Sequence, residues 1–262
     1  MKVGVAGLGR MGFGMARALR AGGIDVVGFD VAPREGTWVA PDARAFAQGI
    51  TTLITVVRDA AETDAVLFDE QAVLAHAPHL DTVIISSTLS PRYVMALRDR
   101  VPTHIHLIDA PMSGAQIAAD EARLTFMLGG AEEVLDRHQP LFDLMGQRFH
   151  RMGAFGQAAA AKVLNNLVAA SSVAATRTAL AWADALGLAE ERLLALMHDS
   201  SGQTWFGSNF DAIEFARDGL AADNTIAILV KDVAAALDAA PAGADRELAA
   251  ALISTISSLE PR

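Results

Sequence analysis

Short apolar runs rich in β-branched residues alternate with helix-like stretches over residues 1 to about 152 of the chain. The expected strands are residues 2–7, 24–30, 51–57, 82–87, 104–109 and 123–129. The expected helices between them are residues 11–22, 42–49, 61–69, 91–100 and 131–145. Continuous apolar strands are typical of a parallel sheet that is buried on both faces. The alternation therefore predicts an α/β fold with a doubly wound sheet.

The pattern changes near Gly153, where the alternation of strands and helices stops. An alanine-rich stretch without proline or glycine follows Gly156 and continues to about Leu186. At about 1.5 Å per residue it predicts a helix of roughly 45 Å. Residues 190–260 or so indicate further helices and no strand. We therefore expect a sheet domain over residues 1–155 and an all-α domain over 156–262, joined through the long helix.

The first strand runs directly into a glycine-rich turn, Gly7–Gly12 (Gly7-Leu8-Gly9-Arg10-Met11-Gly12), which opens a helix. Gly7 permits a tight turn, Gly9 lets the backbone approach a pyrophosphate, and Gly12 lets helix and strand pack closely. The helix N-terminus offers unpaired N–H groups to phosphate oxygens. A glycine turn without a ligand is the simpler alternative, but strand, helix and acid all fall where a dinucleotide requires them. The first domain is therefore expected to be a Rossmann domain.

Asp30 ends the second strand, 18 residues after Gly12, where a carboxylate accepts hydrogen bonds from the adenosine ribose hydroxyls. Arg34 is placed to contact a 2′-phosphate, but the charge of Asp30 would repel one. The charge argument favours NAD as the cofactor, with NADP as the alternative.

Two further segments carry candidate chemistry. The loop Asp109–Gly114 follows the fifth strand and can present the Ser113 hydroxyl and N–H groups to a carboxylate, although an ordinary tight turn explains it equally well. Lys162 and Asn166, four residues apart, share one face of the long helix. A lysine near a helix start opposes the dipole, which favours the neutral amine that moves protons. A solvated lysine is the alternative, but the apolar neighbours of Lys162 argue against it.

The composition narrows the function classes. The 262-residue chain is 52% hydrophobic and has a formal net charge of −10, which argues against binding nucleic acid or anionic membranes. It contains no cysteine, and its seven histidines show no metal-ligand spacing, so no metal site is expected. No signal peptide is visible, and no apolar run was expected to approach the ~18 residues of a membrane span. A cytoplasmic protein is therefore expected.

Four motifs in order resemble the signatures of the β-hydroxyacid dehydrogenases, the group of 3-hydroxyisobutyrate dehydrogenase and tartronate semialdehyde reductase within the 6-phosphogluconate dehydrogenase superfamily. They are Gly7–Ala16, Asp109–Ala115 followed by Leu124–Gly130, Gly156–Asn166, and Lys231–Val233. Together they extend over nearly the whole chain. The resemblance is specific for the superfamily and does not identify a substrate.

The resemblance implies an oxidoreductase that transfers a hydride between NAD(P) and a small β-hydroxy acid or its semialdehyde. It implies that Lys162 is the catalytic general acid or base and that Ser113, Gly114 and Asn166 hold the substrate. The cofactor-binding residues that the motifs and the resemblance indicate are Gly7, Leu8, Gly9, Arg10, Met11, Gly12, Asp30, Val57, Arg58, Thr88 and Lys231. The long helix suggests a dimer, although it could equally form the core of a monomer. A homo-oligomer, either a dimer or a tetramer, is expected.

The chain departs from the family pattern at several positions. Arg58 replaces a common proline, and Ala115 and Ala158 each replace a glycine. Asn224 falls where many members carry a phenylalanine that faces the pocket, and the last segment after Lys231 looks shortened. These departures keep two alternatives open. One is a reductase of imines or another non-standard carbonyl substrate, although that branch usually lacks the lysine. The other is a non-catalytic dinucleotide-binding protein.

Overall fold

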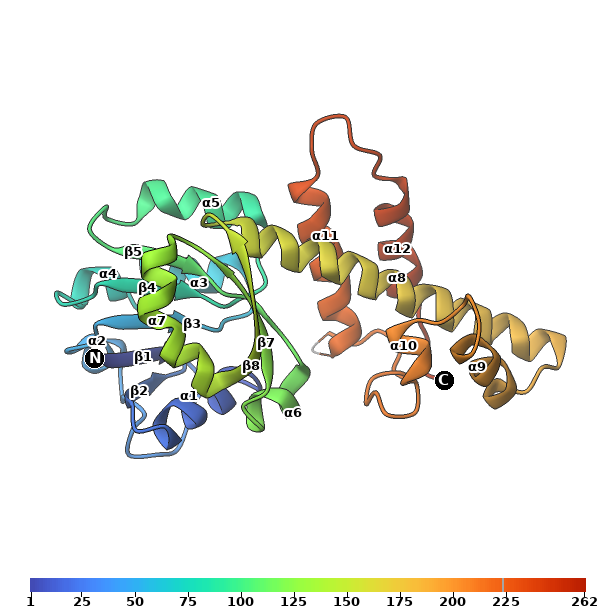
Figure 1. Cartoon of the computed structure of the whole chain (residues 1–262), viewed down its shortest axis with the longest axis horizontal. Helices are drawn as coiled ribbons and strands as arrows, with labels where there is room; N and C mark the ends of the chain where they lie inside the picture. The colour runs from blue at the N-terminus through green and yellow to red at the C-terminus, as the bar shows by residue number, and fades with distance from the viewer. Residues whose placement is uncertain (223) are drawn as a thin grey trace. The chain divides into compact units, whose positions relative to one another are not determined.

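The computed structural model describes residues 1–222 and 224–262 of the chain (Figure 1). Contacts divide it into two compact units, Met1–Lys162 and Val163–Arg262. The first unit holds every strand that the structure describes, and the second is helical. Each unit is described in turn.

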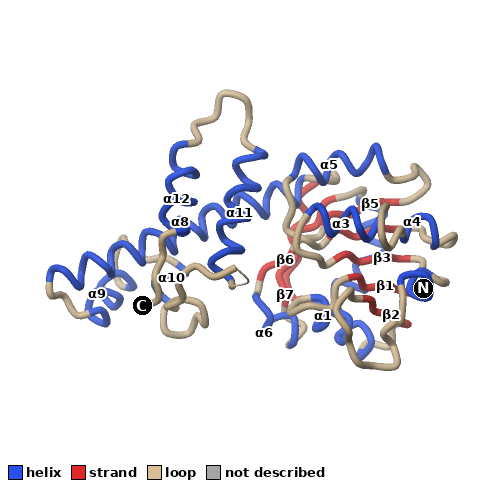
Figure 2. The backbone as a smooth tube through the Cα atoms, turned by 180° about the vertical axis from the view of Figure 1, so that it is seen from behind, coloured by secondary structure: helices blue, strands red, loops and turns tan. Residues whose placement is uncertain are grey.

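An eight-stranded sheet forms the first unit, and its strands are drawn in red in Figure 2. The strands are β1 (Lys2–Ala6), β2 (Asp25–Phe29), β3 (Thr52–Thr55), β4 (Thr82–Ile85), β5 (His106–Asp109), β6 (Met112–Ser113), β7 (Leu124–Gly129) and β8 (Gly146–Gly153). Their order is β2-β1-β3-β4-β5-β7-β6, with β8 paired to β7. The five strands from β2 to β5 are parallel. The strand order reverses between β1 and β3, and ligands of such sheets bind beyond the carboxyl ends at this point.

The seven helices described in the first unit are α1 (Gly12–Ala21), α2 (Ala43–Ala47), α3 (Ala60–Leu67), α4 (Val73–His76), α5 (Pro91–Arg100), α6 (Ala115–Asp120) and α7 (Glu132–Met145). Side chains at their ends explain several of the starts. The Asp42 carboxylate accepts the Ala45 N–H at 2.8 Å and caps α2, and Asp59 caps α3 in the same way. Pro91 occupies the first turn of α5, where its missing N–H costs nothing.

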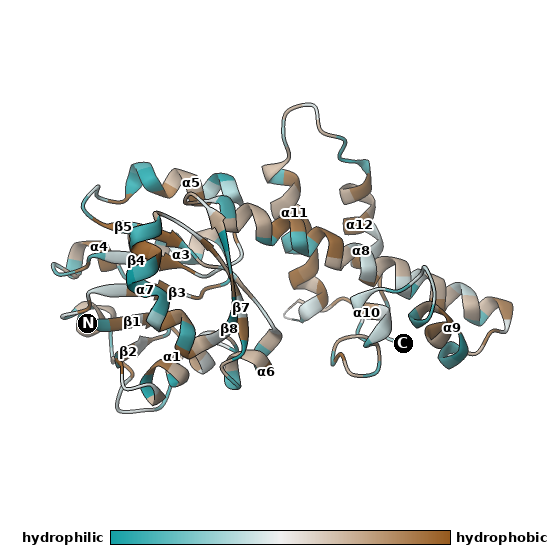
Figure 3. Cartoon of the chain, in the orientation of Figure 1, coloured by the Kyte–Doolittle hydropathy of each residue, from teal (hydrophilic) through white to brown (hydrophobic). Residues whose placement is uncertain are grey.

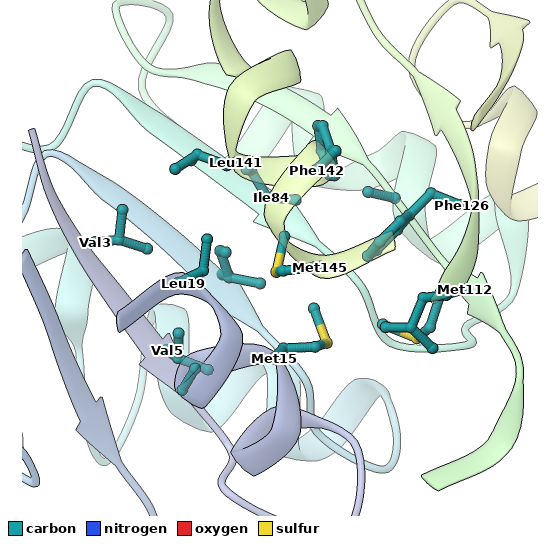
Figure 4. Packing of buried hydrophobic residues seen from close by; sticks show 14 of the residues in the cluster. Val3, Val5, Met15, Leu19, Ile84, Met112, Phe126, Leu141, Phe142 and Met145 are labelled. Atoms are coloured by element: carbon teal, nitrogen blue, oxygen red, sulfur yellow. The ribbon is translucent and has the colours of Figure 1, made fainter. Parts of the chain in front are cut away.

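Apolar side chains cover both faces of the sheet. One cluster packs α1 and α7 against one face, and Figure 4 labels ten of its members: Val3, Val5, Met15, Leu19, Ile84, Met112, Phe126, Leu141, Phe142 and Met145. The other cluster packs α2 to α5 against the opposite face and includes Phe46, Leu53, Val83, Ile85 and Leu97. Neighbouring residues of one strand, such as Leu53 and Ile54, enter different clusters. This is why the strands read as continuous apolar runs.

The second half of the sheet differs from the expectation of a wholly parallel arrangement. The strand expected at 123–129 is present as β7, but it pairs antiparallel with β5 through Asp109 and Gly129. Two strands were not expected at all. β6 has only two residues, and β8 is exposed along most of its length, so it carries no apolar run. An edge strand of this kind gives no hydrophobic signal, because pairing rather than burial holds it in place.

The long helix α8 (Gln157–Leu186) begins in the first unit and continues into the second. By length and composition it is long and apolar enough to cross a membrane, with a mean hydropathy of 1.2 (Figure 3). The expectation that no apolar run approaches that length is therefore wrong. Of the 18-residue stretch of α8 that meets this criterion, 39% is buried inside the protein. Buried core helices of soluble proteins meet the same criteria, so this helix alone does not indicate a membrane protein.

Four more helices complete the second unit: α9 (Glu190–His198), α10 (Trp205–Ser208), α11 (Thr225–Ala239) and α12 (Glu247–Ser257). Their apolar faces form a separate core with α8, built around Val173, Phe206, Ile226, Val233 and Ile256. Buried Arg177 of α8 donates to the backbone oxygens of Ala216 and Asp218, both at 2.8 Å, and of Glu260. The side chain therefore ties the loop before α11 and the last residues of the chain to α8.

Candidate active site

The glycine turn after β1 has three glycines with different physical requirements. Gly7 has φ +93°, and a Cβ there would lie 2.4 Å from the Val56 oxygen at the end of β3. A Cβ on Gly12 would lie 1.9 Å from the Gly7 oxygen. A Cβ on Gly9 would meet no heavy atom within 4 Å. Gly7 and Gly12 therefore shape the turn, whereas Gly9 leaves open space above it.

The turn leads into α1, whose first N–H groups donate no hydrogen bond to a capping side chain at Met11. The N–H groups at the start of a helix and the positive end of its dipole form a site for phosphate oxygens. Open space at Gly9 gives a pyrophosphate room to approach the backbone. The turn therefore fits the diphosphate of a dinucleotide.

Asp30 lies directly after β2 and holds the glycine turn. Its Oδ2 accepts the Leu8 N–H at 2.8 Å, and its Oδ1 accepts the Ala32 N–H at 2.8 Å. The Nε of Arg34 lies 3.3 Å from Oδ2, although the Asp30 side chain is only 11% exposed. The sequence indicated a ribose contact for Asp30 and gave no sign of its bond to the turn. The carboxylate still has lone pairs for ribose hydroxyls.

Two loops beyond β3 and β4 carry the other expected cofactor residues of the first unit. The Val57 N–H donates to the Ser87 Oγ at 2.9 Å, so this bond links the two loops, and Thr88 follows Ser87 directly. Arg58, which replaces the family's proline, is held by Glu62 of α3. Its backbone N–H lies 2.8 Å from Oε2 and its Nε 2.6 Å from Oε1. Arg58 therefore uses its N–H, which a proline lacks.

The expected substrate loop begins at β6, where Ser113 pairs with Thr125 of β7. Gly114 has φ +141°, and a Cβ there would lie 2.5 Å from the Ala118 Cβ. The next residue, Ala115, has φ +56° at the start of α6. This is the left-handed region, which alanine adopts at a cost. The family's second glycine is thus replaced at a position where the backbone still favours glycine.

Asp109 joins this loop to the helix that carries Lys162. The side chain is fully buried at the end of β5, and Oδ1 accepts the Gly156 N–H at 2.9 Å. Oδ2 accepts the Ala159 N–H at 2.7 Å. Burial raises the pKa of the Asp109 carboxyl above its ordinary value, while these backbone hydrogen bonds act in the opposite direction. The sequence alone indicates no role for Asp109, although an acid that ends a buried strand is an unusual feature.

Lys162 lies in the second turn of α8 and is only 7% exposed. Its neighbours Ala158, Ala159 and Val163 are also buried. The alternative of a solvated lysine is therefore wrong. Ala158, which replaces a glycine of the family motif, is fully buried within α8, so the extra methyl group is accommodated there.

The second unit brings together three polar residues of α8 and α11. The Asn166 Nδ2 donates to the Asp232 Oδ2 at 2.6 Å, and the Lys231 Nζ lies 3.1 Å from the Asp232 Oδ1. Asp232 is buried, with 3% exposure. Asn166 and Lys231 were both expected site residues, and Asp232 connects them. Asp232 belongs to the motif Lys231–Val233, but the sequence alone indicates no role for it.

Asn224 is the N-cap of α11, and both polar groups of its side chain are engaged. Its Oδ1 accepts the Ala227 N–H at 3.2 Å, and its Nδ2 donates to the Gly219 oxygen at 2.7 Å. Asparagine is a favoured N-cap residue, whereas phenylalanine has no group for this task. The departure at Asn224 therefore has a local structural reason.

Two other features lie away from these residues. A surface cavity of about 490 Å³ at the amino ends of β1 and β2 is lined by Lys2, Arg20, Asp25 and Trp38 among others, and it contains no expected site residue. Among residues 1–222 and 224–262, no group of three or more histidine and acidic side chains is placed to hold a metal ion.

Two family models match the chain end to end. The NAD binding domain of 6-phosphogluconate dehydrogenase matches residues 2–153. The NAD-binding domain of NADP-dependent 3-hydroxyisobutyrate dehydrogenase matches residues 156–259. The two matches together cover both parts of the fold.

Individual relatives agree with the family models. An NAD-dependent L-serine dehydrogenase of Pseudomonas aeruginosa is 32% identical over 215 residues, which are 78% of this chain and 71% of the relative. An L-threonate dehydrogenase of Pectobacterium atrosepticum is 27% identical over 91% of this chain and 81% of its own. The chain is therefore similar to these two dehydrogenases over most of its length.

Solved structures are similar as well. The Mycobacterium tuberculosis 3-hydroxyisobutyrate dehydrogenase with L-serine superposes with a TM-score of 0.84 at 28% identity, over 98% of this chain and 92% of that chain. An imine reductase from Myxococcus stipitatus in complex with NADP+ has a TM-score of 0.70 at 17% identity, over 98% of this chain and 93% of that chain, and shares the fold alone. The chain belongs to the 3-hydroxyisobutyrate dehydrogenase-like family of NAD(P)-dependent hydroxyacid dehydrogenases.

Proposed function

We propose that the protein transfers a hydride between NAD(P) and a small β-hydroxy acid, or its semialdehyde, with Lys162 as the general acid or base. The observation that carries the proposal is the burial of Lys162 in the second turn of α8, beside apolar neighbours. Lysine side chains are rarely buried, and a buried lysine among the expected site residues is suited to proton transfer. The alternatives leave this lysine without a function.

The substrate class follows from the proposed binding groups and from the relatives. The Ser113 hydroxyl and the Gly114 N–H would bind a carboxylate, and the Asn166 amide would orient the reacting hydroxyl. The substrates in the names of the relatives, L-serine, L-threonate and 3-hydroxyisobutyrate, all carry a carboxylate and a hydroxyl on the third carbon. L-Serine is also named with the similar solved structure. We therefore place the substrate among β-hydroxy acids of three or four carbons.

The proposed cofactor residues hold NAD(P) beyond the carboxyl ends of the strands. The turn Gly7–Gly12 would bind the diphosphate, and Asp30 the adenosine ribose. Val57, Arg58, Thr88 and Lys231 would contact the remainder. We favour NAD, because the Asp30 carboxylate repels a 2′-phosphate and Arg34 lies against that carboxylate.

When bound, the nicotinamide supplies or accepts the hydride. Lys162 Nζ takes the proton of the substrate hydroxyl during oxidation and returns a proton to the carbonyl oxygen during reduction. In this proposal Ser113 and Asn166 would hold the substrate so that this oxygen stays near Nζ. Proper orientation accounts for a large share of the rate in such reactions.

We also propose that the protein works in the cytoplasm as a homo-oligomer, either a dimer or a tetramer. Trp182 and Leu186 near the end of α8 are 69% and 74% exposed, which supports an apolar contact there. Analytical ultracentrifugation at micromolar concentration measures the mass directly. A monomer under these conditions would contradict the proposal.

A panel of small β-hydroxy acids and semialdehydes, each with NAD(H) and NADP(H), tests the function. We expect turnover of at least one acid with NAD, and loss of that turnover by orders of magnitude in Lys162→Ala with NAD binding retained. Lys2→Ala is the matched control, because Lys2 lies at the amino end of β1 and binds the Gln48 oxygen. Near-normal turnover in Lys162→Ala would overturn the mechanism. Cofactor binding with no turnover of any member of the panel would favour a non-catalytic protein, and turnover of imines alone would favour the reductase.

A further inference from the structure

The carboxylate of Asp109 connects two segments that the proposed reaction needs in register. Asp109 is the last residue of β5, and Ser113 follows it by four residues through Ala110 and Pro111. The same side chain holds the first turn of α8, and Lys162 follows Ala159 by three residues. All of these residues belong to the first unit, Met1–Lys162.

The contact replaces an ordinary N-cap. The first N–H groups of a helix have no partner inside the helix and are usually capped by a neighbouring side chain. Here the two oxygens of Asp109, which lies 47 and 50 positions earlier, accept the N–H groups of Gly156 and Ala159, at 2.9 and 2.7 Å. Two bonds to one rigid group fix both the position of the helix end along its axis and its rotation about it.

The residues around the Asp109 carboxylate leave space for it only in the position next to the helix start. Gly129, which pairs with Asp109 across β5 and β7, would bring a Cβ to 2.2 Å from the Asp109 Oδ1. That Cβ would also lie 3.0 Å from the Ala154 oxygen. Any side chain at position 129 would therefore displace the carboxylate from the helix end.

We propose that Asp109 is a positioning residue for the proposed reaction, which sets the start of α8, and with it Lys162, relative to the Ser113 loop. The proposal rests on the function proposed above. Asp109 touches neither substrate nor cofactor in this scheme and acts only through the backbone of α8. The isosteric change Asp109→Asn keeps one acceptor oxygen but turns an NH₂ group towards the second backbone N–H. One bond is lost, and the helix start is free to move.

Asp109→Asn should lower kcat by about 10- to 100-fold, because displacements of an ångström near a reacting group cost about this much. The dissociation constant for NAD should stay unchanged, because the turn Gly7–Gly12 is untouched. The primary deuterium isotope effect on kcat should rise, since hydride transfer becomes more rate-limiting. Gly129→Ala should show the same split between kcat and cofactor binding.

Two variants separate positioning from general loss of stability. Asp42→Ala removes the side chain that caps α2, and Phe142→Leu weakens the core under α7. Both should lower the melting temperature and leave kcat within about twofold at a temperature well below melting. A readout independent of turnover is amide exchange. The Gly156 and Ala159 amides should exchange faster in Asp109→Asn than in either control.

The outcomes distinguish this proposal from the function on which it rests. Near-normal turnover in Lys162→Ala overturns the proposed function, whatever Asp109→Asn does. Loss of turnover in Lys162→Ala together with normal kcat in Asp109→Asn overturns the positioning role alone. The same holds if Asp109→Asn and Phe142→Leu lose kcat in equal proportion, or if the exchange of the Gly156 and Ala159 amides is unchanged. Slow turnover with unchanged NAD binding and faster exchange at these two amides supports it.

Discussion

The Asp30 Oδ2 accepts the backbone N–H of Leu8 at 2.8 Å, so the acid that the sequence places at the ribose also fixes the glycine turn. The two tasks predict different outcomes for two substitutions. Asp30→Asn keeps an oxygen for the Leu8 N–H and removes the charge, so binding of NADP should improve relative to NAD. Asp30→Ala removes both, so binding of both cofactors should weaken about tenfold or more, as the loss of one to two charge-assisted hydrogen bonds implies.

Calorimetric titration of Asp30→Asn and Asp30→Ala with NAD and with NADP measures the four dissociation constants. Arg34→Ala is the companion variant, because it removes the Asp30 partner at 3.3 Å without touching Leu8. Stronger NADP binding in Asp30→Ala than in the wild type would mean that the bond to Leu8 contributes little.

Ala115 carries a backbone strain that glycine would relieve. Its φ of +56° lies in the left-handed region, which costs an alanine about 1 kcal/mol. Ala115→Gly should therefore leave stability unchanged or raise it by up to about 1 kcal/mol, because the flexibility of glycine in the unfolded chain offsets part of the gain. Ala61→Gly, on the exposed face of α3, should lose about 1 kcal/mol.

Urea unfolding measures the free energy of unfolding of both variants, and a loss in Ala61→Gly without a loss in Ala115→Gly is the expected result. An equal loss in the two variants would show that the backbone at position 115 carries no strain. Kinetic constants for Ala115→Gly would also report whether the extra methyl group narrows the substrate range.

The pair Asn166 and Asp232 should act as a unit. Asp232→Ala leaves the Asn166 Nδ2 without the acceptor that lies at 2.6 Å, and it removes the carboxylate beside Lys231. The substrate KM should rise and kcat should fall, each by about tenfold, as expected for a lost hydrogen bond to a charged group. The double variant with Asn166→Ala should be little worse than either single variant. Additive losses in kcat/KM would show that the two side chains act separately.

The end of the chain should make stability depend on acid pH. The guanidinium of Arg262 binds both oxygens of Asp184, at 2.7 and 2.9 Å, and holds the pKa of this carboxyl below its ordinary value. A depressed folded-state pKa contributes stability above the unfolded-state value of about 4, and this contribution is lost as the pH falls through the folded-state value.

Arg262→Ala should therefore melt below the wild type at pH 7, and the gap should narrow at pH 3. Glu190, which Arg262 also contacts, adds to the effect, because Arg217 and Arg262 lower its pKa despite partial burial. Differential scanning calorimetry at pH 7 and pH 3 measures the difference in melting temperature between the variant and the wild type. A gap that stays constant between pH 7 and pH 3 would refute the role of the carboxylates.

The sequence predicted what depends on local pattern. Apolar runs such as Leu53–Ile54 indicated a sheet buried on both faces, and the turn Gly7–Gly12 with Asp30 indicated a dinucleotide. The sequence did not predict β8, because this mostly exposed strand carries no hydrophobic pattern. The antiparallel direction of β7 was not predicted either, because an apolar run contains no information about the direction of the neighbouring strand.

The roles of some side chains could not be predicted from the sequence for a different reason. Asp109 and Asp232 find their partners 50 and 66 residues away, so no local spacing announces the contact. The same holds for the bond from Leu8 to Asp30, which only the closed turn creates. Composition and periodicity predict which residues are buried. The contacts of these three carboxylates depend instead on which distant segments of the chain meet in the fold.

The open space above Gly9 has a consequence for how this turn varies among descendants of the protein. Folding alone selects glycine at Gly7 and Gly12, because a methyl group there would collide with backbone. At Gly9 the folded chain tolerates alanine, and only an occupied cofactor site rejects it. A library screened for expression should therefore accept Gly9→Ala, and the same library screened for growth on the substrate should discard it. Lineages that no longer need the cofactor are expected to lose this glycine before the other two.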